Sequence, residues 1–290
     1  MPTKPYKNII ALIYDFDGTL SPLPMQEYTI LPQIGIKSKK FWESVKEENK
    51  RVQGEEIITY MMKMLKMSEA AEIKMTKKDL GRLASKIRFY PGVVGFFPRI
   101  NKFVKKQSNG QIKVKHYIIS SGLKEILQKI SIRKHFSNIF ASEYHYDYNG
   151  IPKYPKLVIT DTVKTQFLFR INKGKEKIGD NINTHMSEYD RPIPFSNMIY
   201  IGDGLTDVPC MTVTLKNGGY AIAVYRARDR KGFKTCFELF ESGRVEFIAS
   251  ANYKENSDLD KCVQATLKTI IQGILFQKAQ YEQMKKYTGR

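Results

Sequence analysis

The chain has 290 residues, of which 42% are hydrophobic, and it carries a formal net charge of +19. This length suffices for one large core with a smaller companion domain. The longest apolar runs reach only about seven residues, whereas a membrane-spanning helix needs roughly 20, so no membrane partner is expected.

The positive charge and the cysteines indicate the surroundings of the protein. The charge would suit an anionic substrate or nucleic acid, but the lysines are spread along the chain without a long basic block, which favours a general abundance of lysine. Cys210, Cys236 and Cys262 form no CxxC pair, which is typical of free thiols in a reducing cytoplasm. Residues 1–5 are basic and precede an apolar run, but no cleavage site follows, so a signal peptide is not expected.

The first predicted element is a buried strand over residues 9–14, which is short, apolar throughout and rich in branched side chains. A proline-containing loop over residues 21–29 follows, and apolar side chains then recur at helical spacing between residues 41 and 87. These helices predict a small helical cap domain, residues 21–89, inserted after the first strand into a core domain made of residues 1–20 and 90–290.

Strands and helices alternate in the rest of the chain. The predicted elements are, in order, a helix from residue 91, a strand over 114–120, a helix from residue 123, a hairpin over 139–159 around Asn149-Gly150, a helix over 162–172, a polar loop over 175–195, a strand over 197–203, a helix, a strand over 220–225, a further helix and an amphipathic helix over 259–286. This alternation predicts an α/β fold with a doubly wound parallel, Rossmann-like sheet.

Two acidic residues follow the first predicted strand. Asp15 and Asp17 belong to the motif Asp15-Phe16-Asp17-Gly18-Thr19, at the carboxyl end of a strand, where open α/β sheets bind ligands. On a strand that continues through Asp17, both carboxyl groups point to the same side. Such a pair also occurs in ordinary turns, so its meaning depends on the other strand ends.

Two further segments carry groups that can bind an anion. Ser120, Ser121 and Gly122 follow an apolar strand and precede a predicted helix, where a hydroxyl and loop amides can hold an oxyanion, although a plain helix cap fits equally well. Lys164 is predicted in the first turn of a helix, where a cation opposes the helix dipole. A lysine there can neutralise a phosphate or a carboxylate cluster, or can be a solvated surface residue.

A second pair of acidic residues follows a later strand. Asp203 ends the strand over 197–203, Gly204 is expected to permit a tight turn, and Asp207 begins the next helix. Carboxylates at neighbouring strand ends repel one another unless a cation lies between them. With few carboxylates and space for water and phosphate, Mg²⁺ is favoured over Ca²⁺ or Zn²⁺.

With these four motifs in this order, the sequence resembles the haloacid dehalogenase (HAD) superfamily of phosphohydrolases, in its phosphoserine-phosphatase-like branch. The resemblance covers residues 8–225, and the helical insertion is similar to the cap of that branch. It implies that Asp15 attacks phosphorus and forms an aspartyl-phosphate, and that Asp17 acts as general acid and then as general base.

The same resemblance implies roles for the other motifs. Ser120 and Lys164 would hold the phosphate oxygens, with Ser121 and Gly122 beside them. Mg²⁺ would be bound by Asp15, the backbone carbonyl of Asp17, and Asp203, with Asp207 in support.

The expected function is Mg²⁺-dependent hydrolysis of a phosphate monoester of a small metabolite in the cytoplasm. One alternative is a phosphatase for nucleotides or nucleic-acid phosphate termini, which a basic stripe with exposed aromatic residues beside the site would support. Another is a non-catalytic protein that binds a phosphate ligand, against which the presence of both Asp15 and Asp17 argues. The oligomeric state is left open.

The substrate is less well defined by the sequence. Phosphoserine phosphatases carry a glutamate shortly after the first motif, whereas Glu27 falls a few residues late here, so phosphoserine is not specifically expected. Arg51, Arg82 and Arg88 could bind a carboxylate or second phosphate from the cap, but solvated helix faces are the favoured interpretation. The loop over residues 175–195, which contains Arg191, is long enough to border the site.

Overall fold

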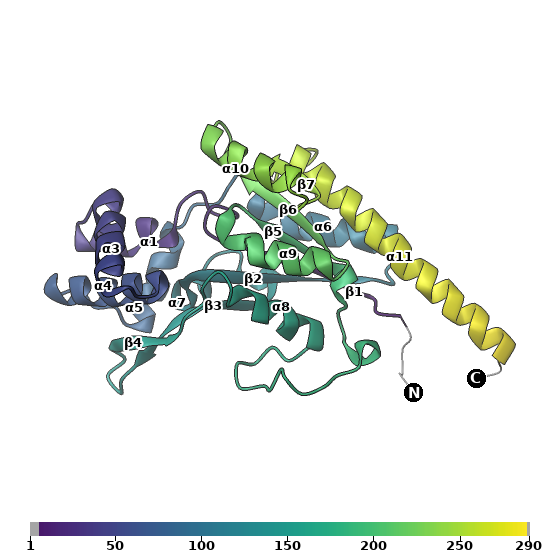
Figure 1. Ribbon diagram of the computed structural model, residues 1–290, viewed down its shortest axis with the longest axis horizontal. Coiled ribbons are helices and arrows are strands. Elements are labelled where there is room, and N and C mark those ends of the chain that lie inside the picture. Colours follow the sequence, from purple (N-terminus) through teal and green to yellow (C-terminus); the bar gives the residue numbers. More distant parts are fainter. Residues whose placement is uncertain (1–5, 289–290) are drawn as a thin grey trace.

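Apolar strands form the centre of the molecule. The computed structural model describes residues 6–288, and the expectation about the basic start of the chain lies outside them. Within residues 6–288, seven strands form one sheet in the order β4-β3-β2-β1-β5-β6-β7 (Figure 1). They are β1 (Ile9–Tyr14), β2 (Lys113–Leu123), β3 (Phe136–Tyr146), β4 (Pro152–Leu157), β5 (Met198–Gly202), β6 (Tyr220–Tyr225) and β7 (Phe247–Ser250). All neighbouring pairs are parallel except the β3–β4 hairpin.

The alternating side chains of β1 enter two different buried clusters. Ile10, Leu12 and Tyr14 belong to one cluster, and Ala11 and Ile13 to the other. Because successive side chains of a strand point to opposite faces, each face of the sheet has its own core. A central strand that is buried on both faces needs apolar residues at every position, as its sequence indicated.

Helices cover both faces of the sheet, as in a doubly wound fold. The core helices are α6 (Val93–Gln107), α7 (Lys124–Leu127), α8 (Lys164–Lys173), α9 (Val208–Lys216), α10 (Arg230–Glu241) and α11 (Asp258–Thr288). Buried residues of α6 and α11 join the cluster of Leu12, whereas those of α8, α9 and α10 join the cluster of Ile13. The predicted α/β fold is thereby confirmed.

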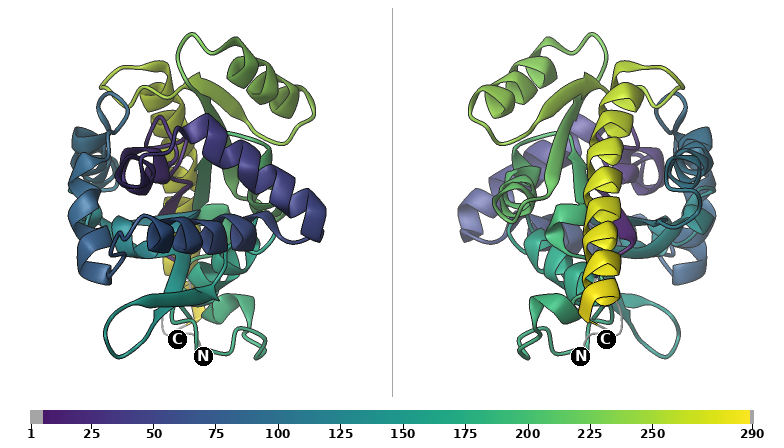
Figure 2. Two further views of the ribbon diagram at one scale, coloured as in Figure 1. Left: turned by 90° about the vertical axis from the view of Figure 1, so that its left-hand side faces the viewer. Right: turned by 90° about the vertical axis from the view of Figure 1, so that its right-hand side faces the viewer.

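A group of helices is inserted between β1 and α6 and lies at one end of the molecule (Figures 1 and 2). These are α1 (Met25–Tyr28), α2 (Ile30–Ile34), α3 (Ser38–Val52), α4 (Glu56–Ala70) and α5 (Lys77–Leu83). Ring contacts between Trp42 and Tyr60, with centroids 5.7 Å apart, join α3 to α4. The apolar core of these helices is continuous with that of one sheet face, so the division into two domains stays a prediction.

The elements differ from the predicted ones in three places. Residues 21–29, expected as a loop, contain α1 and the start of the inserted helices. β2 continues through Leu123, which pairs with Ser142, so α7 begins only at Lys124 and has four residues. β7 is a four-residue edge strand, too short to show a pattern in the sequence.

No helix within residues 6–288 is both long and apolar enough to span a membrane.

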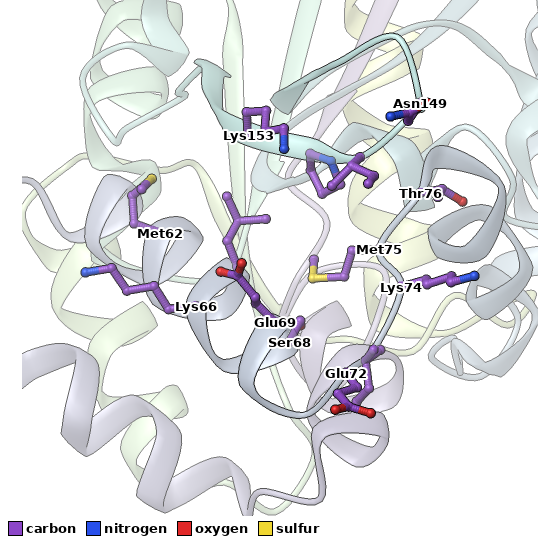
Figure 3. A pocket seen from close by; sticks show the side chains of 14 residues that line it. Met62, Lys66, Ser68, Glu69, Glu72, Lys74, Met75, Thr76, Asn149 and Lys153 are labelled. Carbon is purple, nitrogen blue, oxygen red and sulfur yellow. The ribbon is translucent and has the colours of Figure 1, made fainter.

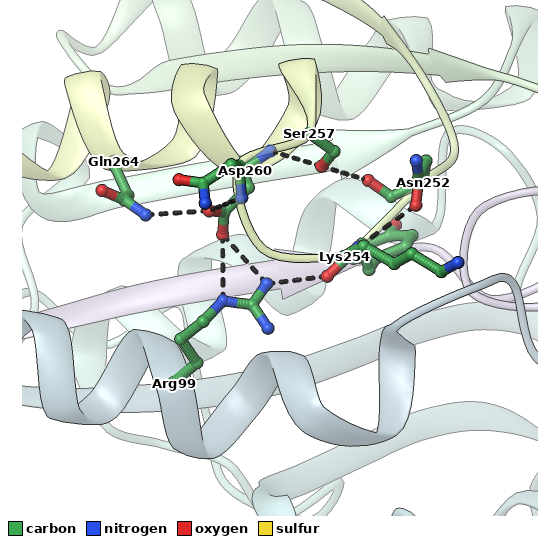
Figure 4. Close-up of polar contacts among 8 residues, drawn as sticks. Arg99, Asn252, Lys254, Ser257, Asp260 and Gln264 are labelled. Atoms are coloured by element: carbon green, nitrogen blue, oxygen red, sulfur yellow. Dashed lines mark hydrogen bonds and ion pairs between the residues drawn. The ribbon is translucent and has the colours of Figure 1, made fainter.

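A partly buried ion pair joins α11 to α6, and the same arginine holds the segment between β7 and α11. Arg99 on α6 donates to Asp260 of α11 at 2.9 Å and to the carbonyl of Tyr253 at 2.7 Å (Figure 4). The Tyr253 hydroxyl in turn donates to the carbonyl of Thr19 at 2.9 Å. The long C-terminal helix therefore helps to position the segment that follows Asp17.

Candidate active site

A buried lysine lies between two carboxylates at the carboxyl edge of the sheet. Lys164 is the first residue of α8, and its Nζ lies 2.9 Å from Asp15 Oδ1 and 2.8 Å from Asp207 Oδ1. Asp15 directly follows β1, and its N–H donates to the carbonyl of Ile201 on β5. Lys164, Asp15 and Asp207 are all at least nine-tenths buried. A buried ammonium of this kind needs paired charges, and here it has two.

The Asp207 carboxylate is held from three directions. Besides Lys164, Oδ1 accepts a hydrogen bond from the Tyr200 hydroxyl at 2.8 Å, and Oδ2 accepts one from the Asp203 N–H at 3.0 Å. A Cβ on Gly202 would lie 2.3 Å from Asp207 Oδ2, so only glycine fits at this position. Asp207 is therefore placed to orient Lys164 and Asp203.

Gly204 does not make the tight turn that the sequence suggested. Its φ is −166°, an extended conformation open to any residue, and a Cβ there would meet nothing within 4 Å. The steric requirement for glycine lies instead at Gly202 and at Gly18. Gly18 has a φ of +85°, and a Cβ on it would overlap the Asp203 carboxylate.

Asp203 is the carboxylate best suited to bind a cation. Within residues 6–288, no hydrogen bond reaches its side chain, although Asp15, Asp203 and Asp207 bring carboxylate oxygens within 4.8 Å of one another. Burial, followed by the charges of Asp15 and Asp207, raises the pKa of Asp203 well above its usual value. A half-buried carboxylate without a hydrogen-bond partner, among like charges, fits a hard divalent cation such as Mg²⁺.

Burial and crowding also change the acidity of the first motif. Burial raises the pKa of Asp15 to about 7, with Lys164 opposing the rise and Asp207 adding to it. For Asp17, burial and then the charge of Asp15 raise the pKa well above its usual value. Its Oδ1 accepts a hydrogen bond from the Met25 N–H at 2.8 Å. Asp17 is thus held beside Asp15 with a raised proton affinity, as a general acid requires.

Ser120 lies on β2, next to the strand that carries Asp15. Tyr14 pairs with Ile118, so Ser120 is level with Phe16, immediately beyond Asp15. Its Oγ accepts a hydrogen bond from the Gly122 N–H at 3.0 Å, and Ser121 offers its carbonyl to a hydroxyl of the cap helix α4. Ser120, Ser121 and Gly122 thus lie in an irregular part of β2 rather than at a helix start, and their role as an oxyanion cradle stays a prediction.

The arginines that the sequence offered as candidates for substrate binding are not joined to the carboxylate cluster by any hydrogen bond or ion pair within residues 6–288. Arg51 and Arg82 are exposed and pair with acidic residues of their own helices, Glu48 at 3.9 Å and Asp79 at 3.5 Å. The loop with Arg191 joins the end of α8 to the start of β5, at the opposite edge of the sheet (Figure 1). Of the two possibilities that the sequence left open for this loop, the structure favours a loop away from the site, because α8 begins at Lys164 and leads away from it.

Sequence reasoning missed several neighbours of the site. Tyr200 lies in the middle of an apolar strand, and its hydroxyl contacts Asp207. Tyr60 of α4 reaches the core from the cap, where its hydroxyl donates to the carbonyl of Ser121 at 2.9 Å. Met25 lies against Gly122 and accepts a hydrogen bond from the Leu123 N–H through Sδ. Only Tyr200, a polar hydroxyl in a strand without other polar residues, gave a signal in the sequence.

The family model described as "Putative Phosphatase" matches residues 10–267 of this chain. The chain belongs to this phosphatase family. A protein of Borreliella burgdorferi (strain ATCC 35210), described as uncharacterized, is 30% identical over 277 residues, which cover 87% of this chain and 94% of that protein. Residues 10–267, which the family model matches, include all four sequence motifs.

Solved structures of phosphatases and hydrolases share the fold. A substrate-bound phosphoserine phosphatase has a TM-score of 0.55 at 13% identity and covers 89% of this chain and 99% of its own. A HAD family hydrolase from Salmonella enterica subsp. enterica serovar Typhi has a TM-score of 0.53 at 18% identity, over 79% of this chain and 67% of its own. The HAD-type fold inferred from the sequence is confirmed.

Proposed function

We propose that this phosphatase hydrolyses the phosphate monoester of a small molecule in a Mg²⁺-dependent reaction through an aspartyl-phosphate. The observation that carries the proposal is the Lys164 ammonium held between Asp15 and Asp207, beside the unpaired Asp203 carboxylate. A similar fold is known in a phosphoserine phosphatase that holds an analogue of a phospho-aspartyl intermediate, with a TM-score of 0.53 at 15% identity.

In the first half of the reaction, an Asp15 carboxylate oxygen attacks phosphorus, and the bond from phosphorus to the leaving oxygen breaks. Asp17, whose pKa is raised by burial and by the charge of Asp15, gives its proton to that oxygen, so the product leaves as a neutral alcohol. In the second half, the Asp17 carboxylate takes a proton from water, which attacks the phosphorylated Asp15 and releases phosphate. Lys164 neutralises charge on the phosphate oxygens throughout, and Ser120 orients them.

Asp15, the carbonyl of Asp17, and Asp203 would hold Mg²⁺, with Asp207 orienting Asp203 and Lys164. When bound, the ion supplies positive charge to the phosphate oxygens and removes the repulsion among the carboxylates. The three free cysteines support a reducing, cytoplasmic location, and two of them, Cys210 and Cys236, are buried.

The test is release of inorganic phosphate from a panel of sugar phosphates, phospho-amino acids, nucleotides and an aryl phosphate, with Mg²⁺ or with a chelator. Asp15→Asn keeps the shape of the side chain but removes the nucleophile, so turnover should fall below detection while the circular dichroism spectrum is unchanged. Asp190→Asn, an exposed change at the opposite edge of the sheet, is the control. Full activity of Asp15→Asn would overturn the proposed mechanism.

A further inference from the structure

Three arginines follow the strand next to the one that carries Asp203. β6 ends at Tyr225. Arg226 and Arg228 lie in the connection to α10, and Arg230 is the first residue of α10. Gly202 pairs with Ala223, so the connection leaves the sheet about two residues beyond the level of Asp203. Neighbouring strands are about 4.8 Å apart, and arginine is one of the longest side chains. The connection therefore borders the candidate active site at the same edge of the sheet.

These arginines are exposed and have no side-chain partner within residues 6–288. The neighbouring Asp229 carboxylate caps α10 by accepting the N–H groups of Lys231 and Gly232 at 3.0 and 3.1 Å, and its single negative charge stands against three arginine charges. This leaves unpaired positive charge beside a site whose other charged groups are mostly carboxylates.

The charges of both the arginine-containing connection and the candidate active site act on Tyr90. Burial and the charge of Asp203 raise the pKa of Tyr90 to about 12, whereas the nearby charge of Arg226 opposes the rise. The Tyr90 N–H donates to the carbonyl of Leu20 in the loop of the first motif. The charges of Asp203 and Arg226 thus act on the same phenol in opposite directions.

Arg88 approaches from the side of the cap. It lies two residues before Tyr90 in the segment that returns from the inserted helices to the sheet, and it is exposed and unpaired within residues 6–288. Its charge opposes the rise in the pKa of Tyr28, which burial produces. Tyr28 belongs to α1, the helix whose first N–H holds Asp17. The bond from the Tyr90 N–H to the carbonyl of Leu20 places this returning segment, which includes Arg88, near the loop of the first motif.

We infer that the substrate carries a second phosphate group besides the one that is cleaved, and that Arg226, together with Arg88, binds it. This inference rests on the proposed function. Lys164 is already engaged with two carboxylates, so it cannot also serve a distant anion. Guanidinium groups match phosphate oxygens in a two-pronged geometry and keep their charge at every relevant pH, which suits them to this task.

A pocket beside the inserted helices is not part of this inference. It has a volume of about 600 Å³ and lies between the end of α4 and the β3–β4 hairpin, where Lys66, Glu69 and Lys153 line it together with apolar side chains (Figure 3). None of the residues of the candidate active site contributes to it.

The test compares matched pairs of substrates that differ only in the second phosphate. A sugar bisphosphate is compared with its monophosphate, and a nucleoside 3′,5′-bisphosphate with the 5′-monophosphate, by kcat/KM at low salt. Comparison of the nucleoside pair with the sugar pair also shows whether a nucleobase strengthens binding. An aromatic surface for such a base is present in α10, where the exposed Phe233 stacks with Phe237. The expected result is a preference for the bisphosphate in at least one pair.

Arg226→Gln should lower that preference, the ratio of the two kcat/KM values, about tenfold, as expected for a lost charge-assisted hydrogen bond. Arg226→Lys should restore it in part. Arg244→Gln is the matched control, because it removes the same charge from an exposed arginine near the amino end of β7, at the opposite edge of the sheet. Its preference should equal that of the wild type.

Binding supplies a readout that does not require turnover. Equilibrium dialysis with Asp15→Asn in the presence of Mg²⁺ should show tighter binding of the bisphosphate, and Arg226→Gln in that background should remove the difference. Equal affinity and equal kcat/KM within every pair would overturn the inference while leaving the phosphatase intact. Absence of phosphate release from every compound would overturn the proposed function, and the dialysis result would then decide the second-phosphate site alone.

Discussion

Lys164 Nζ lies 2.9 Å from Asp15 Oδ1, although the two residues are separated by 149 positions in the sequence. Burial alone would lower the pKa of Lys164, but the charges of Asp15 and Asp207 outweigh it and raise the pKa well above its usual value. The ammonium is therefore permanently charged, and it is the one cation inside a cluster of four acidic residues, Asp15, Asp17, Asp203 and Asp207, in the described chain.

Removal of this cation should reduce stability as well as activity. Lys164→Met keeps most of the side-chain volume but leaves Asp15 and Asp207 buried and uncompensated, which should cost about 3 to 5 kcal/mol of the free energy of unfolding. Urea denaturation measures this loss, and the exposed Lys39→Met is the control. A stability within 1 kcal/mol of the wild type would contradict the charge assignment.

Asp203→Asn should have opposite effects with and without the metal. In a chelator, the substitution removes one of several crowded carboxylates, so the variant should be about 1 kcal/mol more stable than the wild type. Added Mg²⁺ should raise the melting temperature of the wild type but not that of the variant, because a ligand of the ion is lost. Thermal denaturation in both conditions measures this. An equal Mg²⁺ effect in the two proteins would show that Asp203 does not bind the ion.

Gly18→Ala should disturb the site, whereas Gly35→Ala should affect stability alone. Both glycines have positive φ values, +85° and +74°, so alanine introduces backbone strain of about 1 kcal/mol at each. Only at Gly18 does the added methyl group overlap the Asp203 carboxylate. The expected result is a loss of the Mg²⁺-induced stabilisation and of phosphate release in Gly18→Ala only. Equal behaviour of the two variants would show that strain, and not contact with Asp203, is the cause.

His116 should make the protein sensitive to mild acid. It is buried between the Tyr14 hydroxyl and Asn101, at 3.0 Å from each, and burial lowers its pKa to about 3. In the unfolded chain, the His116 imidazole binds a proton below about pH 6.5, whereas in the folded chain it stays neutral down to about pH 3. The contribution of His116 to the free energy of unfolding is therefore complete above pH 6.5 and is lost as the pH falls toward 3.

The free energy of unfolding should therefore fall by about 2 kcal/mol between pH 8 and pH 5 through His116 alone. His116→Gln, which cannot titrate, should show a correspondingly smaller fall in denaturation experiments at the two pH values. The same pH dependence in both proteins would assign the acid sensitivity to other groups.

Much of the site follows from the sequence because parallel strands place their carboxyl ends along one edge. Asp15 and Asp203 each follow an apolar run that has to be a buried strand, so their proximity could be predicted before the pairing of β1 with β5 was known. The position of Lys164 at the start of a helix could be predicted in the same way, from the helical spacing and the glycine that closes the helix.

Local patterns were less informative where a short element depends on its neighbours. The helices α1 and α2 formed in a proline-containing segment because their apolar side chains, such as Met25 and Ile30, are covered by the core. The extension of β2 to Leu123 depends on pairing with β3, which overrides the local tendency to begin a helix.

The parallel α/β architecture could be predicted from the amino-acid order alone, because burial on both faces of a sheet leaves an apolar pattern along each strand, and the four motifs and their order are visible there too. Which groups meet follows from the three-dimensional arrangement alone: the sharing of Lys164 by two carboxylates, the unpaired state of Asp203, and the place of Arg226 after the strand next to that of Asp203. Those relationships depend on strand order and on the connections between strands, which join residues far apart in the chain and leave no periodic signal within it.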